Sequence, residues 1–146
     1  MDFDLAKKFI QQKKYNKALS LLLNSIEKES KSIKLYFLTG FVYFKLNQIE
    51  NSIIYYEQAL EIDPKSIEII LNLANSYYVI GSFFLAEKLY QSAIDLKNDD
   101  PRGYYGIYLV NSNNLNQQHI NTLKEIKKKN TSPKEGYLID FLLSKN

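Results

Sequence analysis

The sequence predicts an all-helical (all-α) fold in which helical hairpins stack one after another into an α-solenoid. Between residues 35 and 64, apolar or small residues recur every three or four positions, stop at Asn47 and then continue with the same spacing. This spacing indicates two amphipathic helices joined by a short turn, which together form a hairpin. The pattern returns after 34 residues without a gap, in the pairs Tyr43 and Tyr77, Tyr56 and Tyr90, and Ala59 and Ala93. A single hairpin cannot bury its apolar face alone, so a repeated hairpin predicts a stack.

The length sets how many hairpins the chain can hold. Its 146 residues have room for about four units of this size and a C-terminal capping helix, in one domain spanning 1–146. The chain is 45% hydrophobic and 24% charged, which is typical of a soluble globular protein. No apolar run reaches the roughly 18 residues of a transmembrane helix, and the acidic, polar N-terminus does not resemble a signal peptide. We therefore expect a cytoplasmic location if the chain is complete.

The first two hairpins are expected over residues 2–29 and 33–63. In the first, the turn falls at residues 13–14, and its polar first helix is expected to face solvent because it ends the stack. Ser32 is positioned to cap the first helix of the second hairpin. Pro64 ends that hairpin, since proline cannot continue a helix.

The third hairpin is expected over residues 67–97. Ser66 can cap its first helix, as Ser32 does in the preceding hairpin. Gly81 is expected to end that helix in the left-handed conformation, which costs glycine little, and Asn47 is expected to do the same in the second hairpin.

The fourth hairpin, expected over residues 101–129, is less regular. Asp100 followed by Pro101 is a strong signal for a helix start. Residues 112–114, Ser-Asn-Asn, are expected to end the first helix early, and residues 116–129 form a polar and basic second helix. The fourth copy is therefore degenerate, as terminal repeats tend to be.

A last helix is expected over residues 133–144. Ser132 and Glu135 have the spacing of a capping box, with proline at the first helical position. Its apolar residues fall on one face, so we expect this helix to seal the end of the stack.

The period and the residue types resemble the tetratricopeptide repeat (TPR), a helical hairpin of 34 residues. The residues that carry the resemblance are Leu5, Ala6, Phe9, Ala18 and Leu22 in the first copy, Tyr36, Thr39, Gly40, Tyr43, Ser52, Tyr56, Ala59 and Pro64 in the second, and Ile70, Leu73, Ala74, Tyr77, Ala86, Tyr90 and Ala93 in the third. The resemblance implies a right-handed superhelix whose concave face is lined by the first helix of each hairpin. Partners of this family usually bind there.

Side chains that point away from the hairpin seams on these first helices form a predicted groove, and they are more apolar than a solvated face should be. The predicted groove residues are Phe37, Leu38, Phe41, Phe44, Leu71, Asn72, Asn75, Tyr78, Arg102, Tyr105 and Leu109. We expect an apolar peptide or helix of another protein to bind here, with Asn72 and Asn75 hydrogen-bonded to its backbone. The predicted function is thus an adaptor, scaffold or chaperone. In the alternative interpretation, Phe37, Phe41 and Phe44 only pack between neighbouring helices.

One subclass of the family binds C-terminal carboxylates of heat-shock proteins through lysines, asparagines and an arginine. Phe37 and Phe41 stand where that subclass has its first lysine and asparagine. Tyr105 and Leu109 stand where it has a further lysine and the arginine. The resemblance therefore does not extend to this subclass.

Enzyme, metal and cofactor chemistry have little support in the sequence. The chain has no cysteine and one histidine, which excludes disulfides and thiolate sites and leaves few ligands for a metal. That histidine, His119, has no evident acidic neighbour, and Asp100 is explained as a helix cap. No glycine-rich phosphate loop is present. We predict no catalytic residues, no metal site and no cofactor.

Two further interpretations remain open. RNA binding through a basic C-terminal hairpin is the alternative function, and the residues concerned are Lys124, Lys127, Lys128, Lys129 and Lys134. Against it, both ends of the chain are basic and the middle is acidic, so no continuous basic stripe is expected. Association into a homo-oligomer, through the groove or through Tyr137, Phe141 and Leu142, is also possible.

Overall fold

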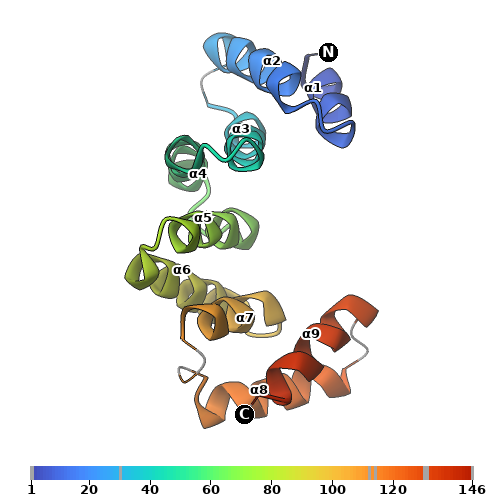
Figure 1. The fold of residues 1–146 in the computed structure, drawn as a ribbon, viewed down its shortest axis with the longest axis vertical. Coiled ribbons are helices and arrows are strands. Elements are labelled where there is room, and N and C mark those ends of the chain that lie inside the picture. Colours follow the sequence, from blue (N-terminus) through green and yellow to red (C-terminus); the bar gives the residue numbers. More distant parts are fainter. Residues whose placement is uncertain (1, 30, 112, 114, 130–131, 146) are drawn as a thin grey trace.

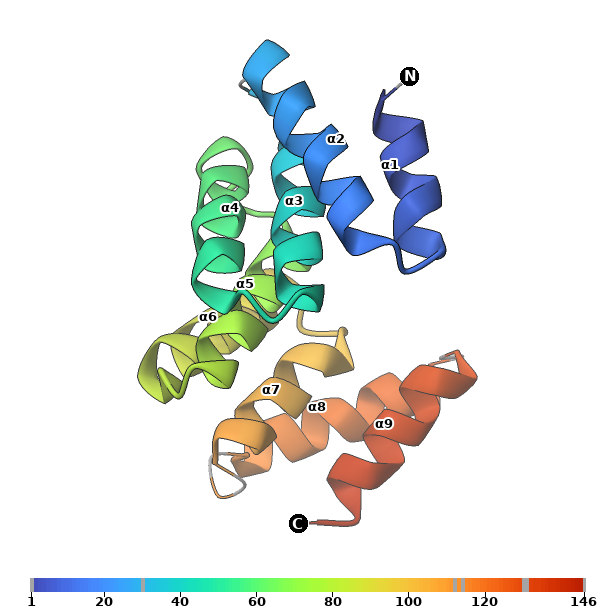
Figure 2. The same ribbon diagram turned by 45° about the horizontal axis from the view of Figure 1, so that its top comes forward.

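The computed structural model describes residues 2–29, 31–111, 113, 115–129 and 132–145, and this part of the chain contains α-helices and no β-strand. The helices are α1 (Asp2–Gln11), α2 (Tyr15–Lys28), α3 (Ile33–Lys45), α4 (Ile49–Ile62), α5 (Ile67–Val79), α6 (Phe83–Leu96), α7 (Pro101–Val110), α8 (Gln117–Lys128) and α9 (Pro133–Leu143). They follow one another in a curved, elongated array (Figures 1 and 2). The predicted all-helical solenoid is confirmed.

The first six helices pack as three hairpins, α1 with α2, α3 with α4, and α5 with α6. The second helix of each hairpin also packs against the first helix of the next one, which joins the hairpins into a stack. In Figure 1, α3, α5 and α7 lie toward one side of the molecule and α4 and α6 toward the other. The first helices therefore form one face and the second helices the opposite face.

The fourth unit departs from this arrangement. Helix α7 has ten residues, whereas α3 and α5 have thirteen, so the predicted early end is found at Val110. Of the residues predicted to break the helix, Ser112 and Asn114 lie outside the described residues. The backbones of α7 and α8 approach each other less closely than those of the first three pairs, and α9 packs against both. The ring of Tyr104 on α7 meets that of His119 on α8 at 5.4 Å.

Two turns have the backbone conformation that the sequence predicts. Gly81 has a φ of 78° and Asn47 a φ of 59°, so both helices end in the left-handed region. Lys13 also has a positive φ, 57°, in the first hairpin turn. Lysine rarely adopts this conformation, and nothing in the sequence around Lys13 predicts a positive φ there.

The predicted helix caps are confirmed at two of four positions. The Asp100 carboxylate accepts a hydrogen bond from the Arg102 backbone N–H (3.1 Å), and Ser132 forms the complete capping box with Glu135. Ser32 and Ser66 stand at the N-cap positions of α3 and α5, but their hydroxyls make no capping hydrogen bond. The side-chain caps predicted there are wrong, because these serines contribute only their backbone carbonyls to the first turn.

The core runs through the stack as three apolar clusters between successive hairpins. Its largest fully buried side chains include Tyr56, Tyr90 and Tyr104. The two helices of the second hairpin approach closely at Gly40, since a Cβ on it would lie 2.8 Å from the Tyr56 ring. Within the described residues, no helix has the length and hydropathy needed to cross a membrane.

Candidate partner-binding surface

The candidate surface is the face formed by the first helices. Helix α3 contacts α5, α5 contacts α7, and α7 contacts α9, so these four helices form a continuous row. Figure 2 shows the row running along the inner side of the curved array, between α1 and α9. The predicted groove residues come from α3, α5 and α7.

Three phenylalanines of α3 are half-buried rather than fully exposed. The ring of Phe37 lies 5.8 Å from that of Tyr56, between centroids. Phe41 packs against two of the core clusters, and Phe44 packs against one of them. One part of each of these side chains thus packs against the core, as the packing interpretation expects. The other part stays accessible to a partner.

On α5 the predicted residues separate into three environments. Leu71 is 5% exposed and belongs to the core, so it offers little surface to a partner. Tyr78 is half-buried against the ring of Phe83, at 5.6 Å. Asn72 donates its side-chain N–H to the Glu68 carbonyl at 2.7 Å, and Asn75 is exposed.

The amide of Asn75 is held by a buried tyrosine. The Tyr90 hydroxyl donates to Asn75 Oδ1 at 2.6 Å. Burial raises the pKa of Tyr90 well above its ordinary value, so the hydroxyl keeps its proton and remains a donor. With Oδ1 held in this way, the two N–H groups of the Asn75 amide can donate to another chain.

On α7, Arg102 is engaged in ion pairs. Its Nη1 donates to Glu68 Oε2 at 2.9 Å, and its Nη2 donates to Asp100 Oδ2 at 2.8 Å. Burial alone would raise the pKa of Asp100, but the hydrogen bonds from the Arg102 side chain and backbone lower it below its ordinary value. Glu68 and Arg102 are 34 residues apart, so the ion pair links equivalent positions of successive first helices. Arg102 therefore joins α5 to α7 across this face.

The aromatic surface continues beyond the predicted groove onto α9. The Phe141 ring meets the rings of Tyr105 and Tyr108 at 6.2 and 5.4 Å. Tyr137, one turn earlier on the same helix, is 77% exposed. The spacing of Tyr137 and Phe141 marked an apolar face in the sequence, but no sequence signal placed it beside α7. Leu109, the last predicted groove residue, is half-buried.

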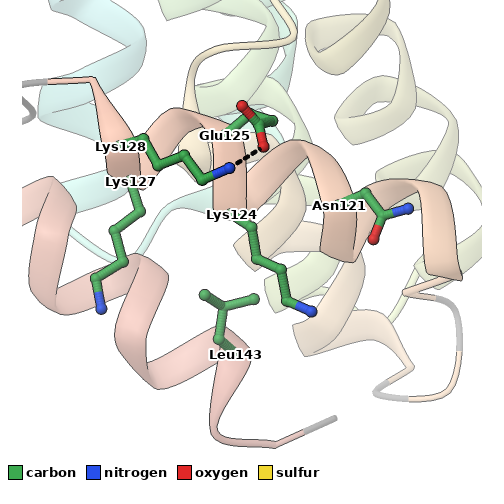
Figure 3. Close-up of a pocket in the computed structure, with 6 residues that line it drawn as sticks. All are labelled: Asn121, Lys124, Glu125, Lys127, Lys128 and Leu143. Carbon is green, nitrogen blue, oxygen red and sulfur yellow. Dashed lines mark hydrogen bonds and ion pairs between the residues drawn. The ribbon is translucent and has the colours of Figure 1, made fainter.

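A hollow of about 760 Å³ lies between α8 and α9 (Figure 3). Asn121, Lys124, Glu125, Lys127, Lys128 and Leu143 line it. Lys128 pairs with Glu125 at 2.6 Å, and Lys127 pairs with Asp140. Two lysines of the basic run are thus compensated by acids. Among the described residues, no group of three or more His, Cys, Asp or Glu side chains could hold a metal ion.

The TPR repeat family matches residues 40–81 of the chain. "Uncharacterized protein ycf37" from Porphyra purpurea is 35% identical over 75 residues, which are 51% of this chain and 43% of that protein. The protein of the same name from Pyropia yezoensis is 34% identical over 74 residues, 51% of this chain and 42% of that protein. The match thus spans less than half the length of either relative.

Solved structures with the same fold are tetratricopeptide domains and a protein named MamA. The second TPR domain of human RPAP3, in complex with an HSP70 peptide, superposes with a TM-score of 0.71 at 15% identity, covering 75% of this chain and 91% of that one. MamA superposes with a TM-score of 0.75 at 17% identity, covering 99% of this chain and 80% of that one. Repeat motif, hairpin geometry and these likenesses agree: the chain contains a tetratricopeptide repeat at residues 40–81 and has the fold of tetratricopeptide repeat domains.

Proposed function

We propose that this protein is a non-enzymatic interaction module that binds an apolar peptide or helical segment of another protein along the row of first helices. The observation that carries the proposal is the run of partly accessible aromatic side chains from α3 to α9 beside an oriented amide at Asn75. Clustered apolar surface of this kind commonly marks an interaction site on a soluble protein. An adaptor, scaffold or chaperone fits such a surface.

The peptide complex of the human RPAP3 domain supports the general mode of action, because a domain with this fold binds a peptide. The same ligand is not proposed for this chain. Phe37 and Phe41 stand where the carboxylate-binding subclass has its first lysine and asparagine, and Asn72 already donates to the Glu68 carbonyl. An apolar segment that contacts the aromatic rings fits better than a chain terminus held by charges. The cytoplasmic location stays a prediction.

RNA binding is not proposed as a second function. Lys127 and Lys128 are paired with Asp140 and Glu125, so the basic run offers phosphates less charge than its sequence suggests. No described feature favours RNA over a protein partner.

The proposal is tested by affinity capture from the source cell with the wild type, Phe41→Glu and Ile54→Glu. Ile54 lies on α4, outside the row of first helices, and is 50% exposed, so Ile54→Glu places the same charge on the other helix of the hairpin. We expect the partner to be lost with Phe41→Glu and kept with Ile54→Glu. Equal capture by both variants, or loss with Ile54→Glu alone, contradicts the proposal.

Phe41 also packs against the core, so Phe41→Glu can destabilise the protein. A second measurement therefore leaves Phe41 in place. A photo-crosslinking residue at Lys45, which is exposed and whose Nζ lies 5.3 Å from the Phe41 ring centre, should crosslink to the captured partner. The same residue at Ile54 should not. Crosslinking from Ile54 and not from Lys45 moves the site to the opposite face.

A further inference from the structure

A second apolar surface lies at the turn between α5 and α6, where the end of α5 meets the start of α6. We call it the α5–α6 corner and define it by Val79, Ile80, Phe83, Phe84 and Leu85, which are 51, 41, 50, 67 and 44% exposed. Figure 1 places this corner at the left margin of the molecule, away from the face with α7 and α9. Five large apolar side chains within seven residues, all this exposed, form a patch that soluble proteins normally cover.

A groove lies directly beside the corner, between α4 and α6. Its volume is about 540 Å³. Apolar side chains make up its floor and walls, namely Leu60, Leu73, Leu85 and Leu89. Glu57 and Glu61 line it from α4, and Lys88 lines it from α6. Leu85 belongs to both surfaces, so the corner and this α4–α6 groove are continuous.

The corner and the groove carry groups of opposite charge. Phe84 projects as the most exposed side chain of the corner, and Lys88 lies over its ring with Nζ 4.4 Å from the centre. The pair thus presents an aromatic ring beside a positive charge. The groove presents an apolar floor beside two carboxylates, of which Glu57 accepts a hydrogen bond from the Tyr77 hydroxyl at 2.6 Å and Glu61 is exposed.

We propose that the chain forms a two-fold dimer in which Phe84 of each copy enters the α4–α6 groove of the other. A two-fold axis makes every contact reciprocal, so Lys88 of each copy also comes to Glu57 and Glu61 of the other. The two-fold axis thereby buries the apolar corner of each copy and pairs Lys88 of each copy with the carboxylates of the other. A second copy of the chain satisfies this pattern without requiring any other partner.

The size of the patch sets the strength of the dimer. Half-exposed side chains of these types bring roughly 450 Å² of apolar surface from each copy, below the ~800 Å² per partner of a standard interface. The dimer is therefore weak and forms at high protein concentration. This interface is centred on α6 and the α5–α6 turn, and it meets the row of first helices at Val79 and at Phe83, whose ring contacts Tyr78.

Sedimentation velocity over a series of concentrations tests the dimer. We expect the wild type to pass from monomer to dimer and to grow no further. Phe84→Ser should weaken dimerisation about tenfold or more, as the loss of a central aromatic anchor does. Tyr137→Ser is the matched control, because Tyr137 is an aromatic residue on α9 that is even more exposed than Phe84. This variant should leave the dimer unchanged.

Charge reversal tests the reciprocal pairing. Lys88→Glu and Glu61→Lys should each weaken the dimer, and the double variant should restore it, because each copy then offers the same pair with the signs exchanged. Both residues are exposed, so the fold should tolerate the changes, which circular dichroism verifies. A wild type that stays monomeric up to about millimolar concentration overturns the proposal. So does a dimer that Tyr137→Ser dissolves and Phe84→Ser does not, or growth into larger assemblies.

Discussion

Tyr56 and Tyr90 occupy equivalent positions of two repeats, yet their rings have different neighbours. The Tyr56 ring lies against Gly40 of the same hairpin, whereas the Tyr90 ring lies against Gly106 of the next one. Both tyrosines and Gly40 belong to the repeat pattern that the sequence shows. That pattern did not predict the role of Gly106, because the position equivalent to Gly40 on α7 is occupied by Tyr108. The Gly106 contact joins two hairpins, whereas the Gly40 contact lies within one, so the two glycines are not equivalent.

We expect Gly106→Ala to destabilise the protein, although alanine favours a helix more than glycine does. A Cβ at this position would lie 2.1 Å from Cδ1 of Tyr90, so the ring or the helix must move. Overpacking of this kind costs about 1–3 kcal/mol. Urea unfolding followed by circular dichroism measures the change in the free energy of unfolding.

The Tyr90 ring provides the control for this prediction. If the clash with the ring causes the loss, Gly106→Ala should cost little in a Tyr90→Leu background, since the new side chain then has space. Equal losses in both backgrounds would assign the effect to something other than this contact.

The helix caps show where residue-level prediction from the sequence ends. Asp100 and Ser132 were predicted as caps and make the expected hydrogen bonds, helped by the proline that follows each of them. Ser32 and Ser66 have the right residue type at the right position, but no capping bond forms. Residue type fixes which side chains can cap a helix. The side-chain rotamer, which the sequence does not specify, decides whether one does.

At the scale of elements, the sequence predicted the helices more completely than their packing. Periodicity located α7, α8 and α9, because the hydrophobic pattern and the caps are local properties of the chain. The looser approach of α8 to α7, and the contact of α9 with both, depend on the connections between them. Placing α9 beside α7 makes it the next member of the row of first helices, which extends the candidate surface.

We expect Leu142→Ala to loosen the C-terminal part of the solenoid and leave the N-terminal part intact. Leu142 is fully buried, in the cluster that α9 shares with α7 and α8. Removing a buried leucine side chain costs about 2–5 kcal/mol. Each repeat contacts only its neighbours, so the effect should stay local. Hydrogen exchange measured by mass spectrometry should show faster exchange in α7, α8 and α9, with α1 to α4 unchanged.

The adjacent residue offers a matched control. Leu143 is half-buried and lines the hollow between α8 and α9, so Leu143→Ala should cost much less. Uniformly faster exchange along the whole chain after Leu142→Ala would show that the solenoid unfolds as a single cooperative unit, contrary to this prediction.

At the scale of the whole molecule, the fold places most acidic residues of the middle of the chain on one face. The sequence shows basic ends and an acidic middle. In the structure, the acids of the middle concentrate on the second helices, where α4 and α6 together carry Glu50, Glu57, Glu61, Glu87 and Asp95 against Lys88. The first helices α3, α5 and α7 carry only one acid, Glu68, and Arg102 is paired with it. The row of first helices is thus mainly apolar, with few unpaired charges.

This separation predicts that partner binding on the first helices depends little on salt. Burial of apolar surface drives such binding, and salt screens only the few exposed lysines of this face. A partner captured by the wild type should therefore stay bound when the salt of the wash rises from about 50 mM to about 500 mM. Phosphate contacts would behave differently, because they release counterions and weaken by orders of magnitude over such a range.

A single-stranded RNA oligomer measured over the same salt series gives the comparison. With Lys127 and Lys128 paired to acids, few lysines are left to contact phosphates, and the slope of log K against log salt should be no steeper than about −2. The variant Glu125→Gln, which releases Lys128, should steepen this slope while the captured protein partner is retained as before. If the protein partner is lost in the high-salt wash while tight RNA binding is seen at low salt, charge rather than apolar surface dominates recognition, and the basic C-terminal helices become the functional site.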